Sequence, residues 1–354
     1  MKKSEEFTKN GAIILGLGNG FLNLVQQWDE MNKNPNLKFK WVELFTSLGR
    51  GAIAGGSIGF GVGWVLDYQN SKQRPIDINS HLNNRSRQIM LSKSDRQFIN
   101  LQKSVNKISK AFSQYFGDKI KGELIPHGST EKGTALNYSF DIDIAVPFYP
   151  KSFLNNEDMY GQVYRYFDNR IGESGIIDIR KQRRSIGVCI LVDDSEYWVD
   201  FAPYKLSKKD GSSGYLYVNR KGFLIDNSTI QKTDLTKLKK NTFSNVQKRI
   251  IVLLKEWKRR NYLPLPSHFL EHLVKDAYRV NNGRLPNSIE KKMIMVLKHM
   301  ADKLHIININ GDENTNNVIS NSIDEYEKQI VIDACKKAIQ EYEYQPNSLV
   351  KNFI

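Results

Sequence analysis

The stretch HGSTEKGTALNYSFDIDIAVPF, residues 127–148, joins a glycine–serine turn to two aspartates one residue apart in an apolar run. Its part FDIDIAV predicts a β-strand, because β-branched residues alternate with other residues and suit a pleated surface. Side chains two positions apart on a strand project from the same face, so we expect Asp141 and Asp143 to lie together. Neighbouring carboxylates repel each other, and a divalent cation is the ligand that best offsets this repulsion.

A second predicted strand, YWVDFAPY at residues 197–204, supplies a third carboxylate. If this strand lies beside FDIDIAV, Asp200 comes next to Asp141 and Asp143. Three carboxylates can bind two Mg²⁺ ions, of which one would make a sugar hydroxyl more nucleophilic and the other would neutralise a leaving pyrophosphate. We therefore predict that these three aspartates are both catalytic residues and metal ligands, for Mg²⁺ with Mn²⁺ as a substitute.

The glycine–serine turn suits a phosphate-binding role. Gly128 lets the backbone approach an anion closely, and the N–H groups of the turn together with the Ser129 hydroxyl can hold a triphosphate. Lys132 adds a positive charge three residues later. An HGS turn or an Asp-x-Asp pair is common by itself, but the turn, the pair and a distant strand aspartate in this order are far more specific.

The composition is that of a folded basic protein. The 354 residues are enough for two domains with real cores or for one large domain. A net charge of +14 indicates polyanionic partners, namely nucleotides, nucleic acid or an anionic membrane surface, although a merely soluble basic surface has the same composition. The two cysteines, Cys189 and Cys335, give neither a disulfide framework nor a zinc spacing, which favours a reducing intracellular setting.

Residues 1–68 are a glycine-rich apolar region without the layout of a secretory signal. Four glycines recur every four residues within residues 51–66, a pattern that lets helices approach closely in a membrane. The uncharged run there is slightly shorter than the ~20 residues of a spanning helix. Residues 11–66 are therefore expected to associate with a membrane or to pack on each other or on another copy. We expect a cytoplasmic protein, with the inner face of the membrane as the alternative location.

The rest of the chain changes from mixed to helical periodicity. We expect a linker at residues 69–93, a catalytic core at 94–240 and a helical lobe at 241–354. In the core, the spacing predicts helices at 94–116 and 157–172 and strands at 123–127, 140–148, 184–192 and 197–204. Helices and strands followed by a helical bundle indicate an α+β molecule of two lobes with a cleft between them.

The order HGS, DID and VDFAP resembles the polymerase-β-type nucleotidyltransferase core. Within that superfamily the chain is most similar to bacterial nucleotidyltransferases related to cyclic GMP–AMP synthase and oligoadenylate synthetase. The resemblance covers about residues 95–300, including RIIVLLKEWKRRNYLPLPSHFLEHLV at 249–274 and a hairpin-like segment at 214–229. It implies a mixed β-sheet core with flanking helices and a C-terminal helical lobe. It also implies that Lys255 contacts nucleotide phosphates and that Ser267 lies near the donor nucleotide.

The resemblance also implies an activity. It points to a template-independent enzyme that joins NTPs with release of pyrophosphate and makes a cyclic di- or oligonucleotide. The product would act as a second messenger in antiphage defence, where a separate effector protein detects it. Nucleic acid would be an optional partner.

Three alternatives stay open. The chain could be an RNA- or protein-directed nucleotidyltransferase of the same superfamily, a catalytically inactive nucleotide- or RNA-binding module, or a membrane or assembly protein with an appended domain. The residues by themselves allow other roles too. Arg259 and Arg260 suit a solvated helix face, Ser267 suits a helix N-cap, and Tyr204 suits either base stacking or core packing.

Overall fold

The computed structural model describes residues 77–207, 213–219, 229–234, 243–311, 314–351 and 353. The chain divides into a unit of Met1–Ile76 and a unit of Asp77–Ile354, and every described residue belongs to the second. The glycine-rich region, with its expected membrane or self-association segment, lies outside the described residues. Among the helices that are described, none is both long enough and apolar enough to cross a membrane.

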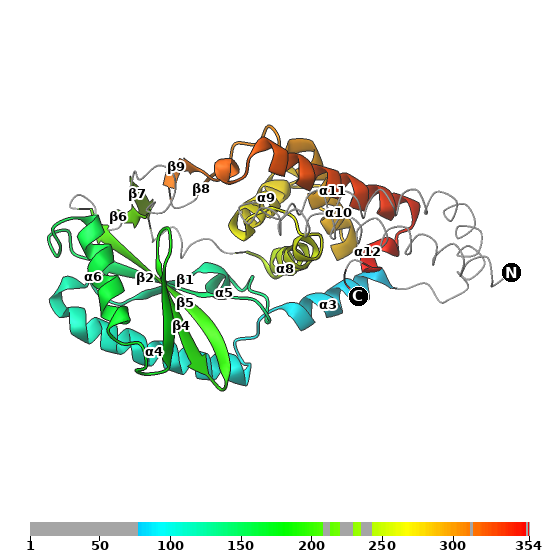
Figure 1. The fold of residues 1–354 in the computed structure, drawn as a ribbon. Helices are drawn as coiled ribbons and strands as arrows, with labels where there is room; N and C mark the ends of the chain where they lie inside the picture. The colour runs from blue at the N-terminus through cyan, green and yellow to red at the C-terminus, as the bar shows by residue number, and fades with distance from the viewer. Residues whose placement is uncertain are drawn as a thin grey trace, which may run out of the picture. The chain divides into compact units, whose positions relative to one another are not determined.

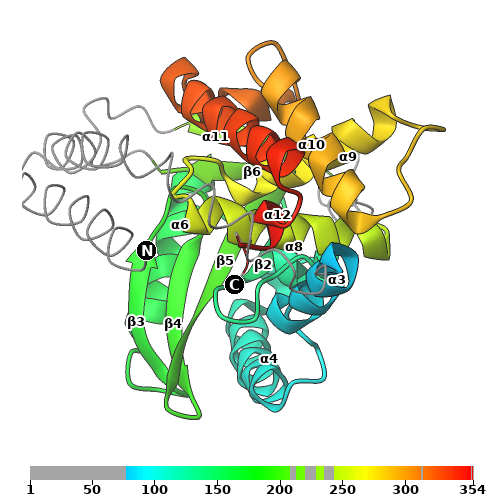
Figure 2. The ribbon, with the colours of Figure 1, turned by 90° about the vertical axis from the view of Figure 1, so that its right-hand side faces the viewer.

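A mixed β-sheet forms the first half of the described unit (Figure 1). Its strands follow the order β1-β2-β5-β4-β3, and Figure 2 shows β3, β4, β5 and β2 side by side. Strands β2 and β5 lie side by side, as the sequence predicted, and they run parallel, whereas the other pairs are antiparallel. The strands of this path are β1 (Ile125–His127), β2 (Ile142–Phe148), β3 (Ile176–Lys181), β4 (Ile186–Val192) and β5 (Ser195–Leu206). Two further strands extend the sheet. Strand β6 (Ser213–Val218) pairs antiparallel with β5, and β7 (Thr229–Asp234) pairs antiparallel with β6.

Two helices cover one face of this sheet. Helix α4 (Arg96–Phe116) begins at its N-cap Asp95, whose side chain accepts from the Gln97 N–H, and it ends at Gly117. Its apolar residues recur at helical spacing and pack with α6 (Asn156–Asp168) against the strands. Because β2 and β5 send alternate side chains into this core, their intervening side chains lie on the opposite face. That opposite face carries the predicted site.

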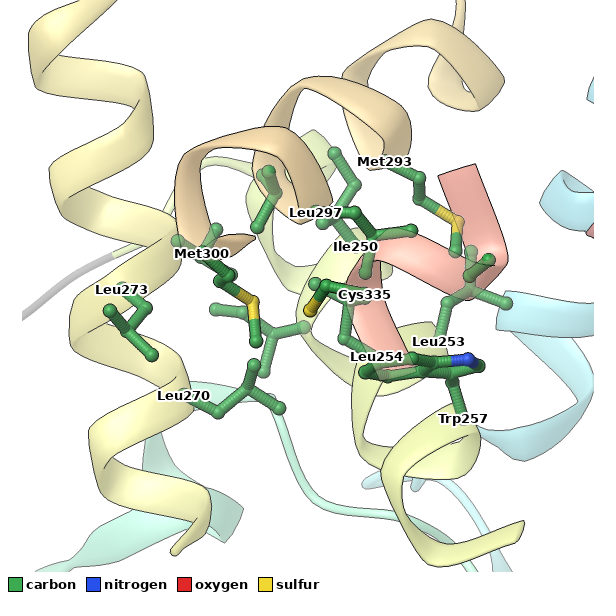
Figure 3. Close-up of a cluster of buried hydrophobic side chains, with 14 of the residues drawn as sticks. Ile250, Leu253, Leu254, Trp257, Leu270, Leu273, Met293, Leu297, Met300 and Cys335 are labelled. Carbon is green, nitrogen blue, oxygen red and sulfur yellow. The ribbon is translucent and has the colours of Figure 1, made fainter. Parts of the chain in front are cut away.

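Helices form the second half of the unit and have their own apolar core, as predicted (Figure 3). Helix α8 begins with a capping box between Ser244 and Gln247. Leu254 of α8, Leu270 of α9 and Met300 of α10 are buried together in this core. The elements are α8 (Asn245–Arg260), α9 (Ser267–Val280), α10 (Ile289–Lys303), α11 (Glu325–Tyr344), α12 (Ser348–Lys351) and a small hairpin of β8 (Asn310–Gly311) and β9 (Asn314–Val318).

The structure corrects the expected linker at residues 69–93. Helix α3 (Ile78–Ile89) lies within it, with Asp77 as a side-chain N-cap. Ile78, Leu82 and Ile89 are buried in the core of the helical half, so this segment is part of the folded unit. The polar composition concealed the helix, because only a narrow stripe of its surface is apolar.

Candidate active site

Asp143 and Asp200 are direct neighbours across the parallel pair of β2 and β5. His127 of β1 is the partner of Asp143 on the other side. Ile142 and Ile144, which flank Asp143, point into the core under α4 and α6, so Asp143 projects from the open face of the sheet. The prediction that the second strand would bring its aspartate beside the first pair is confirmed for these two positions.

Gly128 lies directly against the Asp143 carboxylate. It follows β1 and begins α5 (Gly128–Lys132), with a φ of +78°. A Cβ at this position would come within 1.8 Å of Asp143 Oδ2. Only glycine is compatible with both this positive φ and this short distance. Gly128 therefore allows the backbone of the HGS turn to pack directly against the Asp143 carboxylate. Ser129 follows in the first turn of α5 and is partly exposed.

The carboxylates of this face resist ionisation. Burial raises the pKa of Asp143 to about 7, and the charges of Asp200 and Asp141 add to the effect. Burial and then the charge of Asp141 raise the pKa of Asp200 to about 6. Burial also raises the pKa of Asp141, which is exposed and comes immediately before β2. Two carboxylates that are held side by side against their own repulsion form a site suited to a cation.

The donor atoms fit Mg²⁺, which binds carboxylate oxygens. Asp143 and Asp200 lie together, and Asp141 is near enough to raise the pKa of both. Within the described ranges, however, no three His, Cys, Asp or Glu side chains are arranged so that they could together hold a metal ion. The structure therefore joins two of the three predicted ligands and leaves Asp141 beside them.

Lys255 occupies a buried ionic network. Its Nζ donates to Glu271 Oε1 at 2.8 Å and to the Thr134 carbonyl at 3.0 Å. Lys132 Nζ, from the turn of α5, donates to Glu271 Oε2 at 3.0 Å, and the Thr134 hydroxyl donates to Glu271 Oε1 at 2.7 Å. Two lysines share one carboxylate, so the network retains one positive charge close to the Gly128 turn.

The pKa values in this network follow from the ion pairs. Burial alone would raise the pKa of Glu271, but Lys255 and Lys132 lower it to about 2. Burial lowers the pKa of Lys255, and Glu271 opposes that shift. Sequence reasoning missed Glu271 as part of the site, because it lies in an ordinary amphipathic helix and only the fold brings it to Lys132.

Ser267 is the exposed first residue of α9, one turn before Glu271. The expectation that it also caps the helix is wrong, since Pro266 holds the N-cap position and no side-chain cap bond forms. The expectation of a solvated basic face at Arg259 and Arg260 is also wrong in part. Both side chains pair with the buried Glu256, at 3.2 Å and 2.7 Å.

Three other residues receive clear placements. Tyr204 is 2% exposed and packs in a small apolar cluster, which favours core packing over base stacking. Burial lowers the pKa of His127 to about 4, so this side chain is neutral at pH 7. Gln182 Nε2 donates to Asp200 Oδ1 at 2.9 Å and holds that carboxylate in place. No sequence signal marks Gln182, because it comes from the turn between β3 and β4.

Residues 105–206, which contain the turn and all three aspartates, match a family model described as a nucleotidyltransferase domain. These residues form a nucleotidyltransferase domain. It spans most of α4, strands β1 to β5 and helices α5 and α6. No curated protein matches the chain.

Several solved structures share the fold of this chain. The structure of Escherichia coli MS115-1 CdnC with ATP has 17% sequence identity to this chain and a TM-score of 0.58. The alignment covers 78% of this chain and 95% of that chain. Bradyrhizobium diazoefficiens CdnG, a CD-NTase in complex with GTP, is 11% identical with a TM-score of 0.57, covering 79% and 98%. The Cid1 poly(U) polymerase with Mg and 3′-dATP is 11% identical with a TM-score of 0.54, covering 78% and 99%. These likenesses confirm the two-lobed α+β fold.

Proposed function

We propose that this protein is a template-independent nucleotidyltransferase that joins NTPs, releases pyrophosphate and makes a cyclic di- or oligonucleotide. The observation that carries the proposal is the pairing of Asp143 with Asp200 on one face of the sheet, with Gly128 packed against Asp143. A paired carboxylate site and an anion-accepting turn are the two parts that nucleotidyl transfer needs. The fold shared with CdnC and CdnG, whose structures contain ATP and GTP, supports NTPs as the substrates.

In this proposal the Gly128 turn receives the donor triphosphate. The backbone N–H groups of the turn and the Ser129 hydroxyl bind phosphate oxygens. Lys132 and Lys255 supply the positive charge, since their shared carboxylate neutralises only one of them. Ser267, at the start of α9, contacts the donor nucleotide.

Asp141, Asp143 and Asp200 would hold two Mg²⁺ ions, or Mn²⁺, which would activate a ribose hydroxyl and neutralise the pyrophosphate. The remaining contribution of the chain is alignment, because a reaction between two bound nucleotides gains most from holding them in place. Gln182 fixes the Asp200 carboxylate, and Gly128 fixes the position of the turn relative to Asp143. Rigid placement of these groups stabilises charge that develops during transfer.

The product would be a second messenger for antiphage defence, detected by a separate effector protein. This part of the proposal is supported by the likeness to bacterial CD-NTases. The catalytic core at residues 94–240 would work with the helical lobe at 241–354 in the cytoplasm. Residues 11–66 would set location at the inner face of the membrane or self-association.

The test is incubation of the full chain with all four α-³²P-labelled NTPs and Mg²⁺ or Mn²⁺. Products are treated with phosphatase and separated by chromatography and mass spectrometry. A phosphatase-resistant species without terminal phosphates is the expected result. Asp143→Asn and Asp200→Asn are expected to abolish it, and Asp118→Asn, at an exposed site away from the turn, serves as the matched control. Full activity of the two site variants would refute the site.

A second candidate is an RNA-directed nucleotidyltransferase, which the fold shared with Cid1 poly(U) polymerase favours. The same reaction with a 5′-labelled single-stranded RNA distinguishes the two. Extension of the RNA without a cyclic product would support this candidate in place of the first.

A further inference from the structure

The row of residues that contains Asp143 and Asp200 continues across the sheet. Gly187 of β4 is the partner of Asp200, and Arg180 of β3 is the partner of Gly187. Direct partners in neighbouring strands project from the same face. Arg180 therefore lies on the face of the aspartates, on the opposite side of Asp200 from Asp143 and the Gly128 turn.

Gly187 makes room for the Arg180 side chain. A Cβ on Gly187 would come within 2.9 Å of Gln182 Nε2 and within 3.0 Å of Arg180 Nε, so both side chains would have to shift to make room for a larger residue. The guanidinium lies over the Trp198 ring, 3.9 Å from its centroid. By contrast, Lys181, the next residue, lies over the Tyr164 ring on the face covered by α6. The two adjacent cations of β3 thus serve opposite faces of the sheet.

Arg180 acts electrostatically on the aspartates. Its charge opposes the upward pKa shifts of Asp141 and Asp200, which places it within electrostatic reach of both. It is nevertheless exposed. The N–H groups of a guanidinium lie in its own plane. A guanidinium that lies over an indole ring can therefore still bind phosphate oxygens in pairs through these N–H groups.

The geometry of transfer decides which nucleotide Arg180 meets. In an in-line displacement the attacking and leaving oxygens lie on opposite sides of the phosphorus atom. If the pyrophosphate of the donor lies at the Gly128 turn, the attacking nucleotide must come from the opposite side of the carboxylates. That side is occupied by Gly187, Arg180 and Trp198.

We propose that Arg180, stacked on Trp198 above Gly187, binds a phosphate group of the acceptor nucleotide. The inference rests on the proposed function and adds a second substrate subsite to it. A ribose hydroxyl oxygen of the nucleotide held there forms a bond to the α-phosphorus of the donor. The bond from that phosphorus to the oxygen bridging to the β-phosphate breaks, pyrophosphate leaves with the electron pair, and the hydroxyl proton passes to water.

The test compares Arg180→Ala with Lys181→Ala, which removes the same charge from the next position of β3 on the opposite face. The donor is an α-³²P-labelled 2′,3′-dideoxy-NTP, which lacks the hydroxyls that attack, and unlabelled NTP is the acceptor. Initial rates are measured while each is varied in turn. Thermal unfolding of both variants verifies that they fold.

We expect Arg180→Ala to raise the KM for the acceptor about 10- to 100-fold, the range for a lost charge-assisted hydrogen bond, and to change the donor KM less than about twofold. Arg180→Lys keeps the charge but loses the planar fork, so its acceptor KM should lie between those of the wild type and the alanine variant. Lys181→Ala should match the wild type. An unchanged acceptor KM in Arg180→Ala, or an equal rise in both KM values, would overturn the inference.

Binding separates this inference from the proposed function. The number of nonhydrolysable NTP analogues bound per chain with Mg²⁺ is measured by calorimetry. A wild-type protein that binds two analogues but performs no transfer would contradict the proposed function, and loss of one analogue in Arg180→Ala would still support the acceptor subsite. Equal numbers bound by the wild type and Arg180→Ala would refute the subsite.

Discussion

Replacing Asp143 by asparagine should stabilise the metal-free protein at alkaline pH. The carboxyl has a pKa of about 7 in the folded protein against 3.8 as its ordinary value. Asparagine has the same shape and no charge, so the substitution removes the cost of ionising this group within the fold. The ionised carboxylate therefore lowers the free energy of unfolding, as the residues of functional sites commonly do.

The magnitude follows from the difference in pKa. Each tenfold change in proton affinity corresponds to about 1.4 kcal/mol, so the rise from 3.8 to about 7 costs at most about 4 kcal/mol above pH 7. Water that reaches this partly exposed carboxyl screens its charge and reduces the expected effect to about 2 kcal/mol. Because the folded pKa lies above the unfolded one, the free energy of unfolding falls as the pH rises from about 4 to about 7.

The assay is urea unfolding of the wild type and Asp143→Asn in EDTA at pH 5 and pH 8. The variant should be more stable by about 2 kcal/mol at pH 8 and by less than half of that at pH 5, where the wild-type carboxyl is mostly protonated in the fold. Asp118→Asn, at an exposed carboxylate, should leave stability within about 0.5 kcal/mol at both pH values. A variant that is less stable than the wild type at pH 8, or equally stabilised at both pH values, would refute the reasoning.

Three further predictions concern the same site. Gly128→Ala should lower transfer at least about 100-fold, because a Cβ there overlaps the Asp143 carboxylate and displaces the turn; activity near that of the wild type in the labelled-NTP assay would contradict the contact. Glu271→Gln should lower the free energy of unfolding by about 3 kcal/mol at pH 7, because it leaves two buried lysines without their carboxylate; a loss below about 0.5 kcal/mol in urea unfolding would argue against the network. Addition of Mg²⁺ at pH 8 should raise the Tm of the wild type and should do so much less in Asp200→Asn, and an equal rise in both proteins would count against Asp200 as a metal ligand.

Part of this molecule could be predicted from local sequence alone. The period of two in FDIDIAV indicated a strand with its aspartates on one face, and the structure confirms Asp143 there. The helical spacing of apolar residues predicted α4 at 94–116, where the helix is Arg96–Phe116. Such patterns are readable because strand and helix periods are properties of a few neighbouring residues. The order of the turn and the aspartates carried the family resemblance for the same reason.

The strand β3 (Ile176–Lys181) was not predicted, and most of its side chains are exposed. It forms by pairing with β4, and that pairing is what brings Arg180 into the row of Asp200. The segment Ile78–Ile89 has a polar composition, and only the core that it packs on makes it a helix of the folded unit.

The environment of the site was decided only by tertiary structure. Glu271 meets Lys132 across 139 positions of the chain, and Thr134 across 137. The proton affinity of Asp143 depends on burial and on Asp200, which is 57 residues further on (200 − 143). The sequence by itself therefore determined which residue types stand at the site and on which local elements. The tertiary structure decided which charges meet and how strongly, because electrostatic interactions depend on distance and burial in space and not on separation along the chain.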